Sequence, residues 1–347
     1  MVEIGSEFWT IEPSKFDIRF FLSGRTALDF IIRDILAERE ICTVHMPSFC
    51  CHTMIEPFVR NKIPVLFYDV FFENGILTAS VPKIHSNDIF FCIKYFGYEK
   101  QEMGNLPEIK NSGCIVIEDT THSWLMYSEK ADEPSLADYS FASFRKWTGF
   151  TGVAAAKKEN GKFLISQKCL INEEYEALRK DAQEKKRLYI QSFSGNKQDF
   201  LEKFSAAEAM LENDYLDYQP TAESISALIC LDKKKIKNRR RKNAKILLDG
   251  ISEIKGITPM FSKLGPHDSP LCVPVIIDSS VRDNLRRYLI SQQIYCPVHW
   301  PLSPLHNNIS GKAKEIYNLQ LSLVCDQRYD TEDMVRLVKS IKSFFGV

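Results

Sequence analysis

The sequence lacks an excess of either charge, a long apolar run and a recognisable leader. Lysine plus arginine and aspartate plus glutamate both total 45, so the 347-residue chain has no net charge to attract nucleic acid or an anionic membrane surface. No apolar run approaches the roughly 18 residues that a membrane-spanning helix needs. Residues 1–15 contain acids where a secretory leader has basic residues. These absences predict a soluble, cytoplasmic protein that binds neither nucleic acid nor a membrane.

The chain also lacks a CxxC pair, a Walker P-loop and a glycine-rich dinucleotide fingerprint. Its ten cysteines are scattered, and several lie in apolar stretches where cysteine acts as a small hydrophobic residue: Cys42, Cys92, Cys114, Cys230 and Cys272. This usage fits a reducing compartment. Residues 45–52 contain two histidines and two adjacent cysteines, but adjacent cysteines rarely ligate one tetrahedral ion, so no metal site is expected.

What is present is an alternation of strand-like and helix-like segments. Short apolar runs typical of buried strands occur at residues 42–46, 64–70, 89–93, 114–117 and 139–144. Segments with helical periodicity alternate with these runs. This order predicts an α/β fold with a mostly parallel sheet.

Two of these strands end in charged residues. The run 114–117 stops at Glu118-Asp119, and the run 139–144 stops at Arg145-Lys146. Because ligands bind outside the carboxyl ends of the strands of open α/β sheets, an acid of Glu118-Asp119 and Lys146 are expected to face one pocket. An acid and an amine there suit pyridoxal 5'-phosphate (PLP), which has a basic ring nitrogen and an aldehyde. The alternative is a surface ion pair that contributes about 0–1 kcal/mol.

A phosphate seat is expected at the start of the first helix. Ser23 is a good N-cap and Gly24 permits close approach of the backbone. Apolar residues then repeat at helical spacing, at Ala27, Leu28, Ile31, Ile32, Ile35 and Leu36. The free N–H groups of such a first turn bind anions.

The second half of the chain predicts polar helices and a smaller domain. Residues 172–190 and 199–216 have mixed charges typical of exposed helices. One helix is predicted from residue 222 through the basic run 233–241 to residue 248, and the basic run is interpreted as a solvated helix face rather than a nucleic-acid patch. A strand at 271–277 and helices at 282–291 and 331–345 predict a smaller α+β domain. We place the boundary between residues 225 and 226, which gives domains of 1–225 and 226–347.

With these residues in hand, the sequence resembles the DegT/DnrJ/EryC1/StrS family of sugar aminotransferases, which are fold-type I PLP-dependent enzymes. The resemblance covers nearly the whole chain. Its anchors are residues 23–28 (SGRTAL), 47–51 (PSFCC), 117–122 (IEDTTH), 143–147 (SFRKW) and 298–301 (VHWP). The opening residues 4–8 and the Ser-Phe-Arg-Lys sequence are most similar to a subgroup associated with surface-polysaccharide (lipopolysaccharide) gene clusters.

The resemblance implies a role for each matching residue. Lys146 would bond covalently to PLP and then move a proton between substrate and cofactor, while Asp119 would keep the pyridine nitrogen protonated. Phe49 would stack on the ring, and His122 would lie beside the ring hydroxyl. The phosphate would be bound by Gly24, Arg25, Thr26 and Ser143. The roles of His299 and Trp300 stay open.

The resemblance also implies a reaction and an assembly. An amino acid, with L-glutamate as the expected donor, would leave its amine on PLP, and a nucleotide-linked keto-sugar would collect it. Relatives with histidine in place of the lysine are dehydratases, so Lys146 favours transamination. The active site of the family lies between two subunits, which implies a homodimer.

Two departures from the family pattern leave alternatives open. The chain has Thr151-Gly152-Val153 where an Asp-Gly or Gly-Gly pair is usual, and Asp217-Tyr218 where an Asn-Tyr pair contributes to the phosphate site across the dimer. These departures motivate a second hypothesis, a regulatory relative that binds PLP without transamination. A nucleotide-binding α/β domain without PLP is a third, which the missing glycine-rich fingerprint disfavours.

Overall fold

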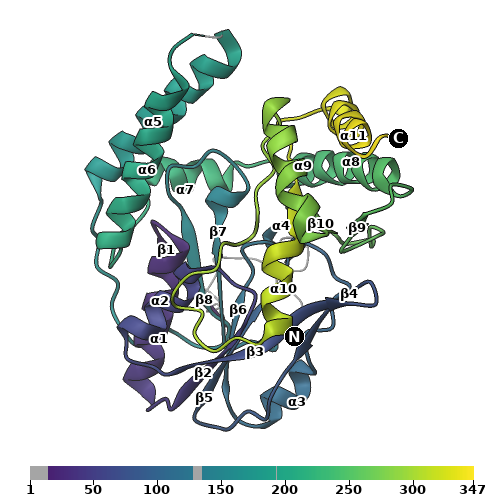
Figure 1. The fold of residues 1–347 in the computed structure, drawn as a ribbon. Helices are drawn as coiled ribbons and strands as arrows, with labels where there is room; N and C mark the ends of the chain where they lie inside the picture. The colour runs from purple at the N-terminus through teal and green to yellow at the C-terminus, as the bar shows by residue number, and fades with distance from the viewer. Residues whose placement is uncertain (1–14, 128–134, 193) are drawn as a thin grey trace, which may run out of the picture.

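The computed structural model describes residues 15–127, 135–192 and 194–347 (Figure 1). The opening motif at residues 4–8 lies outside the described residues. In the described part, no helix combines the length and the apolar character that crossing a bilayer requires.

An eight-stranded sheet forms the centre of the larger part of the molecule. Its order is β1 (Asp17–Phe21), β8 (Ala154–Lys158), β7 (Tyr139–Ser143), β6 (Ile115–Asp119), β5 (Asp88–Ile93), β2 (Thr43–Pro47), β3 (Val65–Glu73) and β4 (Ile76–Ser80). The five strands from β7 to β3 run parallel, whereas β1, β8 and β4 pair antiparallel at the two edges. The predicted mostly parallel α/β sheet is therefore confirmed, and the antiparallel edges are additions to it.

Helices pack against this sheet because they bury apolar faces on it. They are α1 (Gly24–Glu38), α2 (His52–Arg60), α3 (Leu106–Asn111), α4 (Trp124–Tyr127) and, from far along the chain, α10 (Gly311–Leu319), which lies beside β3. Ser23 is the N-cap of α1, as predicted, and its Oγ accepts a hydrogen bond from the Thr26 N–H at 3.2 Å. Of the predicted apolar face of α1, only Leu36 is exposed.

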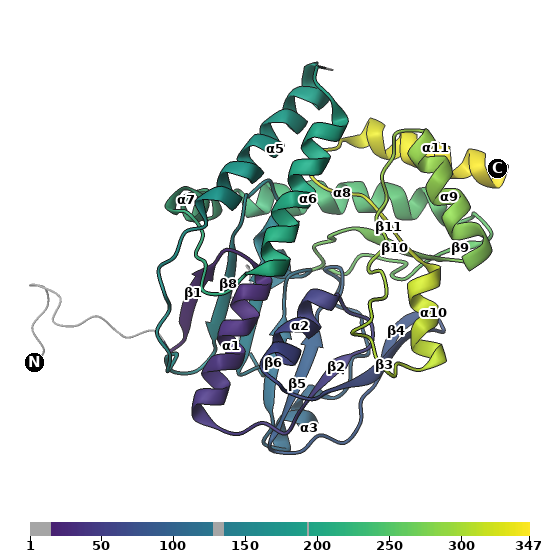
Figure 2. The same cartoon turned by 60° about the vertical axis from the view of Figure 1, so that its left-hand side comes forward.

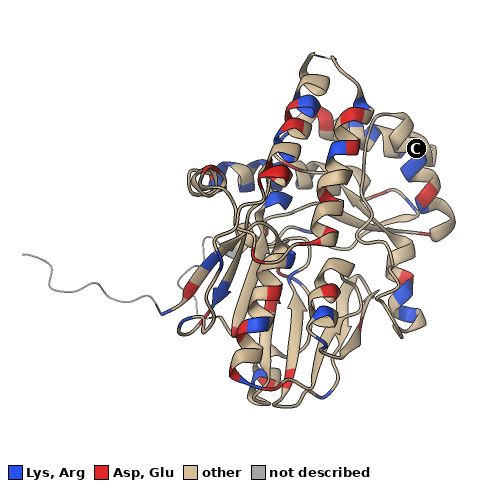
Figure 3. Cartoon of the chain, turned by 90° about the vertical axis from the view of Figure 1, so that its left-hand side faces the viewer, with Lys and Arg blue, Asp and Glu red and all other residues tan. Residues whose placement is uncertain are grey.

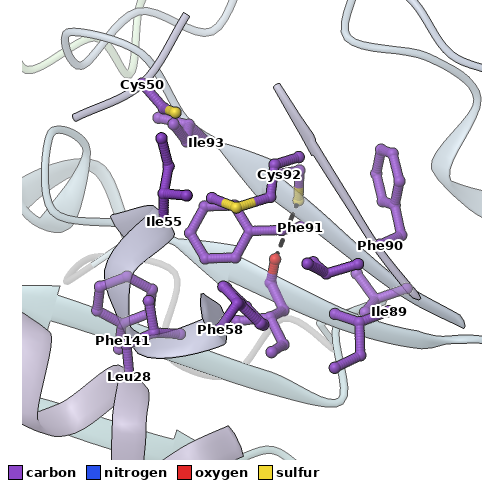
Figure 4. Close-up of a cluster of buried hydrophobic side chains, with 14 of the residues drawn as sticks. Leu28, Cys50, Ile55, Phe58, Ile89, Phe90, Phe91, Cys92, Ile93 and Phe141 are labelled. Atoms are coloured by element: carbon purple, nitrogen blue, oxygen red, sulfur yellow. Dashed lines mark hydrogen bonds between the residues drawn. The ribbon is translucent and has the colours of Figure 1, made fainter. Parts of the chain in front are cut away.

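The core between sheet and helices is dense in aromatic side chains (Figure 4). Phe58 of α2 meets Phe91 of β5 edge to face, with ring centroids 5.9 Å apart. The Cys92 thiol lies in the same core and donates to the Ile117 carbonyl at 3.7 Å. Burial of this apolar surface is the main stabilising contribution to the fold. The apolar interpretation of the cysteines is right for Cys92, Cys114 and Cys272 and wrong for Cys42 and Cys230, which are exposed at the ends of their elements.

A smaller α+β unit forms the C-terminal part, as the sequence predicted. Its three-stranded antiparallel sheet has the order β11 (Gln320–Leu323), β10 (Val273–Ile277) and β9 (Ile257–Pro259). The helices α8 (Lys233–Ile251), α9 (Ser279–Ser291) and α11 (Thr331–Phe345) pack with it around a separate apolar cluster. The boundary between residues 225 and 226 falls within α7 (Ala222–Ile229) and stays a prediction.

The helix predicted from residue 222 to residue 248 is two helices, α7 and α8. The chain leaves the helical path at residues 230–232, where Asp232 becomes the N-cap of α8 and its Oδ1 accepts from the Lys235 N–H at 2.9 Å. The basic run within α8 is not a uniformly solvated face, because Lys237 and Arg240 are buried. Residues 172–190 and 199–216 form α5 (Glu173–Ser192) and α6 (Lys197–Asn213), a hairpin that projects beyond the sheet (Figure 2).

Candidate active site

Asp119 and Lys146 reach the same edge of the sheet from neighbouring strands. Strands β6 and β7 are parallel neighbours, and Asp119 pairs in register with Phe141. The strand predicted to include Phe144 ends one residue earlier, and a single 3₁₀ turn, η1 (Phe144–Lys146), carries Lys146 past the strand end. Because parallel strands present their carboxyl ends together, the sheet brings the acid and the amine to one site.

Asp119 is buried with its carboxylate held by the following turn. Its side chain is 1% exposed, and Oδ1 accepts a hydrogen bond from the Thr121 N–H at 2.8 Å. Burial raises the pKa of Asp119 to about 6, although the Thr121 hydrogen bonds and the positive charge of Lys146 act in the opposite direction. A positively charged ligand next to Asp119 would therefore stabilise the ionised form of its side chain.

Lys146 lies in a recess, where its side chain is open to the solvent but surrounded by protein on several sides. These surroundings lower the pKa of Lys146, and the neighbouring cation Arg145 lowers it further, while Cys51 and Glu208 act in the other direction. A lysine with a lowered pKa is more often neutral at physiological pH, and only the neutral amine is a nucleophile or a base.

His122 lies within a group of stacked rings near Lys146. Its imidazole stacks on Phe96 and Trp300, each with ring centroids 5.3 Å away, and His299 meets it edge-on at 5.5 Å. Within the described part of the chain, the buried Nδ1 of His122 has no hydrogen-bond partner. Burial, His299 and Lys146 hold the pKa of His122 well below its usual value, so the ring is neutral. An unpartnered polar atom this deep is costly, which fits a ligand that completes its hydrogen bonding.

His299 is fixed by a network from the smaller unit. Its Nδ1 lies 2.7 Å from Ser322 Oγ, and its backbone N–H donates to Gln320 Oε1 at 2.8 Å. Burial, followed by the charge of Lys146, lowers the pKa of His299 to about 3. The imidazole therefore reaches the site in its neutral form.

The residues of the expected phosphate seat lie together at the start of α1. A Cβ built on Gly24 would lie 3.2 Å from Ser143 Cβ, so the first turn of α1 directly contacts the end of β7. Ser143 is held by its N–H, which donates to Thr121 Oγ1 at 3.1 Å. The Thr26 hydroxyl donates to the Tyr215 carbonyl at 2.7 Å, and the Arg25 guanidinium pairs with Glu56 at 3.0 Å. The first-turn N–H groups, rather than these two side chains, are thus the donors best suited to an anion.

Phe49 lies in the core rather than on an open surface. It is fully buried against Tyr95, Trp300 and Tyr317, with ring centroids 5.2–5.6 Å away. Its expected role as the residue that stacks on the cofactor ring therefore stays a prediction.

The two departures from the family pattern have clear local structures. In the 151–153 turn, a Cβ on Gly152 would lie 2.8 Å from the Leu22 carbonyl oxygen, so only glycine fits there. The Thr151 hydroxyl donates to Glu176 Oε2 at 2.5 Å. Asp217 forms ion pairs with Arg33 at 2.7 Å and Lys168 at 3.0 Å. Its negative charge is therefore already balanced within its own chain.

Two neighbours of Lys146 were not predicted from the sequence. Cys51, the N-cap residue of α2, is half-buried and accepts from the Thr53 hydroxyl at 3.2 Å. Glu208 of α6 binds Arg145 through both carboxylate oxygens, at 2.5 and 3.0 Å. Cys51 lies in the turn between the end of β2 and the start of α2, and this position could have indicated it. Nothing near Glu208 in the sequence links it to residues 145–146.

Comparison with known proteins identifies the class of the fold. No family model matches the chain, and no curated protein matches its sequence. Solved structures do match. The aminotransferase TlmJ from Streptoalloteichus hindustanus is 15% identical, with 95% of this chain and 86% of that chain covered and a TM-score of 0.63. PseC from Helicobacter pylori, an aminotransferase involved in pseudoaminic acid biosynthesis, is 13% identical, with 95% and 86% covered and a TM-score of 0.64.

A third match connects the fold to the cofactor. Spr1654 from Streptococcus pneumoniae, a provisionally assigned sugar aminotransferase solved in its PLP form, is 14% identical, with 95% and 87% covered and a TM-score of 0.65. The chain therefore has the fold of the fold-type I PLP-dependent aminotransferases. The expected resemblance to the DegT-family sugar aminotransferases is confirmed at the level of the fold.

Proposed function

We propose that the protein is a PLP-dependent aminotransferase that moves an amino group from an amino acid, with L-glutamate as the expected donor, to a nucleotide-linked keto-sugar. The observation that carries this proposal is the placement of Lys146 and Asp119 at one sheet edge, close enough for their charges to interact. Support for PLP comes from Spr1654, which is known in forms with PLP and with PMP.

The residues of the site fit PLP in three places. The unpartnered Nδ1 of His122 would hydrogen-bond the ring hydroxyl, and Asp119 would accept the proton-bearing ring nitrogen. The first-turn N–H groups of Gly24 and Arg25, with Thr26 and Ser143 beside them, would bind the phosphate at the positive end of α1. When bound, PLP supplies an electron sink for the negative charge that develops on the substrate carbon.

The chain's own residues supply the proton transfers. With its lowered pKa, Lys146 would hold PLP through its amine and would serve as the base that takes the proton from the substrate carbon. Asp119, in its ionised form, would hold the ring nitrogen as its acceptor. His122 and His299 stay neutral and add no competing positive charge near Lys146.

The proposed setting is an amino-sugar pathway for surface polysaccharide in the cytoplasm, with a homodimer as the active form. The support for the acceptor is PseC, which takes part in pseudoaminic acid biosynthesis, and Spr1654. The ion-paired Asp217 would meet a phosphate across the dimer with its charge already neutralised by Arg33 and Lys168.

A visible absorption spectrum tests the proposal most directly. The purified protein is incubated with PLP and then with L-glutamate, and Lys146→Ala is the control. We expect a band of lysine-bound PLP that glutamate removes and that Lys146→Ala lacks. A band that no amino acid alters would support the alternative, a regulatory relative that binds PLP without transamination. Absence of any band would disprove the cofactor assignment.

A further inference from the structure

A recess of about 500 Å³ opens beside Lys146 and is strongly basic. Its walls come from η1 and the turn after it, from the α5–α6 hairpin, from α8 and from residues 326–328. Six basic residues besides Lys146 line it, namely Arg145, Arg179, Lys186, Arg187, Arg240 and Arg328. Among the described residues, Asp326 alone adds a carboxylate to this lining. Figure 3 shows charged residues of both signs along the hairpin that forms one wall.

The carboxylates near the recess do not balance these cations. Glu208 binds Arg145 at 2.5 Å and lies 3.4 Å from Arg179, so two guanidinium groups share one carboxylate. Asp326 is bound by Arg328 at 2.7 Å, and Glu184, outside the lining, neutralises Arg187 at 2.6 Å. The recess therefore retains an excess of positive charge.

Three of the cations show this imbalance individually. The Nε of Arg179 is buried and finds no hydrogen-bond partner in residues 15–127, 135–192 and 194–347. The ammonium of Lys186 lies 5.9 Å from the centre of the Phe204 ring, without a carboxylate partner among the described residues. Arg240 is bound to neutral oxygens, at 2.8 Å to Gln327 Oε1 and 2.9 Å to the Leu271 carbonyl.

The crowding of cations has an electrostatic cost. Burial lowers the pKa of Lys186, and the nearby Arg328 and Arg179 lower it further, while Asp326 acts in the opposite direction. Burial likewise lowers the pKa of Arg179, and Arg145 adds to the effect. Like charges held together in this way destabilise the protein unless a ligand neutralises them, and such arrangements gather at binding sites.

We propose that this recess binds the diphosphate group of the acceptor substrate, with Lys186, Arg179 and Arg328 as its ligands. The inference rests on the proposed function, because it assigns the phosphate-bearing end of the acceptor to the hairpin side of Lys146. A single carboxylate would be satisfied by one arginine, whereas cations from α5 and from residues 326–328 match a group with several negative oxygens. Phe204 and Ile190 add apolar surface beside them.

Calorimetric titration with inorganic pyrophosphate tests the inference. The protein is first saturated with PLP, so that the phosphate seat on α1 is filled, and the ionic strength is held constant. We expect pyrophosphate to bind more tightly than orthophosphate and Lys186→Met to weaken pyrophosphate binding about tenfold or more, as expected for loss of one charge-assisted hydrogen bond. Methionine has an unbranched side chain of similar length without the charge, so the variant is expected to fold.

A neighbour on the same helix provides a matched control. Lys185 is partly exposed, lies 3.7 Å from Asp181 and does not line the recess. Lys185→Met removes one positive charge, as Lys186→Met does, but leaves the recess intact. The affinity of Lys185→Met for pyrophosphate is expected to stay within about twofold of the wild type, since an exposed charge outside the recess is largely screened by salt. Equal weakening by both variants, or no binding by the wild type, would overturn the inference.

The two proposals fail separately. If glutamate removes the PLP band but pyrophosphate does not bind, the diphosphate site is wrong and the aminotransferase proposal stands. If pyrophosphate binds with the expected dependence on Lys186 in a protein that forms no PLP band, the anion site in the recess stands and the aminotransferase proposal is wrong. Occupation of the recess by an acidic segment of a second subunit would show as absence of pyrophosphate binding in a dimer, and this also overturns the inference.

Discussion

Two carboxylates follow one another at the end of β6, and only one of them faces Lys146. Successive residues of a strand point to opposite faces of the sheet. Asp119 interacts with Lys146, whereas Glu118 pairs with Lys94 at 3.4 Å. The sequence indicated that a carboxylate lay at this strand end, and the resemblance selected Asp119.

This difference predicts unequal effects of two conservative substitutions. We expect Asp119→Asn to slow the glutamate half-reaction at least about 100-fold, because removing one partner of a buried charge pair costs about 3–5 kcal/mol. Glu118→Gln should change the rate less than about threefold, since its partner Lys94 is partly exposed. Stopped-flow absorbance measures both. Equal rates for Asp119→Asn and wild type would contradict the assigned role.

The pKa of Asp119 also predicts how stability depends on pH in the absence of PLP. Burial raises the pKa of Asp119 to about 6 in the folded protein, against about 3.9 in an unfolded chain. Between these two pKa values, Asp119 stays protonated in the folded protein but ionises in the unfolded chain. The contribution of Asp119 to stability therefore falls as pH rises from about 4 to 6, and it is constant above that range.

Asparagine cannot ionise, so Asp119→Asn isolates this effect. We expect the variant to match the wild type near pH 4 and to be more stable by about 2–3 kcal/mol at pH 7, using about 1.4 kcal/mol for each pKa unit. Urea unfolding at several pH values measures the difference. A difference between the two proteins that does not vary with pH would show that Asp119 ionises as readily in the folded state as in the unfolded chain.

At the scale of elements, the sequence predicted those whose signal is local. Strands β2, β3, β5, β6 and β7 and helix α1 were expected close to their observed positions, because continuous apolar runs and helical periodicity arise within each segment. The strands β1, β4, β8, β9 and β11 were missed, because these pair antiparallel at sheet edges or in the small sheet and lack such runs. The residues of α6 and of segment 326–328 that line the recess beside Lys146 are placed by long-range packing, which no local pattern encodes.

The break between α7 and α8 was also missed, and it can be tested through its cap. Asp232→Ala removes the side chain that caps α8 and should lower the free energy of unfolding by about 1 kcal/mol. Asp249→Ala, which removes an exposed carboxylate paired with Lys245 in the same helix, should cost less than about 0.5 kcal/mol. Chemical denaturation compares the two. Equal costs would mean that the cap does not stabilise α8.

At the scale of the whole molecule, an exposed apolar stretch lies beside the expected subunit contact. Leu170 and Ile171 are 47% and 44% exposed, and Leu170 forms a β-bridge to Tyr218, next to Asp217. Grouped exposed apolar residues commonly mark protein interfaces. The expected homodimer would cover them, since the Asp217-Tyr218 pair is where the resemblance places the cross-subunit contact.

Light scattering after size-exclusion chromatography tests the assembly. We expect a mass about twice the 40.0 kDa of the chain, and a shift towards the monomer in Leu170→Glu. Val335→Glu introduces the same charge at a 39% exposed position on α11 of the smaller unit, and should leave the mass unchanged. A wild-type monomer would contradict the dimer, and equal effects of both variants would place the interface elsewhere.

The tryptophans of the candidate site provide an intrinsic fluorescence signal. Trp147 follows Lys146 directly and is anchored by its Nε1–H, which donates to the Thr121 carbonyl at 2.7 Å. Trp300 stacks on His122 on another side of the site. Both indoles are held rigidly in nearly dry surroundings, so their ultraviolet emission is sensitive to a chromophore that arrives at the lysine. Energy transfer from these indoles would follow cofactor loading and each half-reaction in real time, without any attached label.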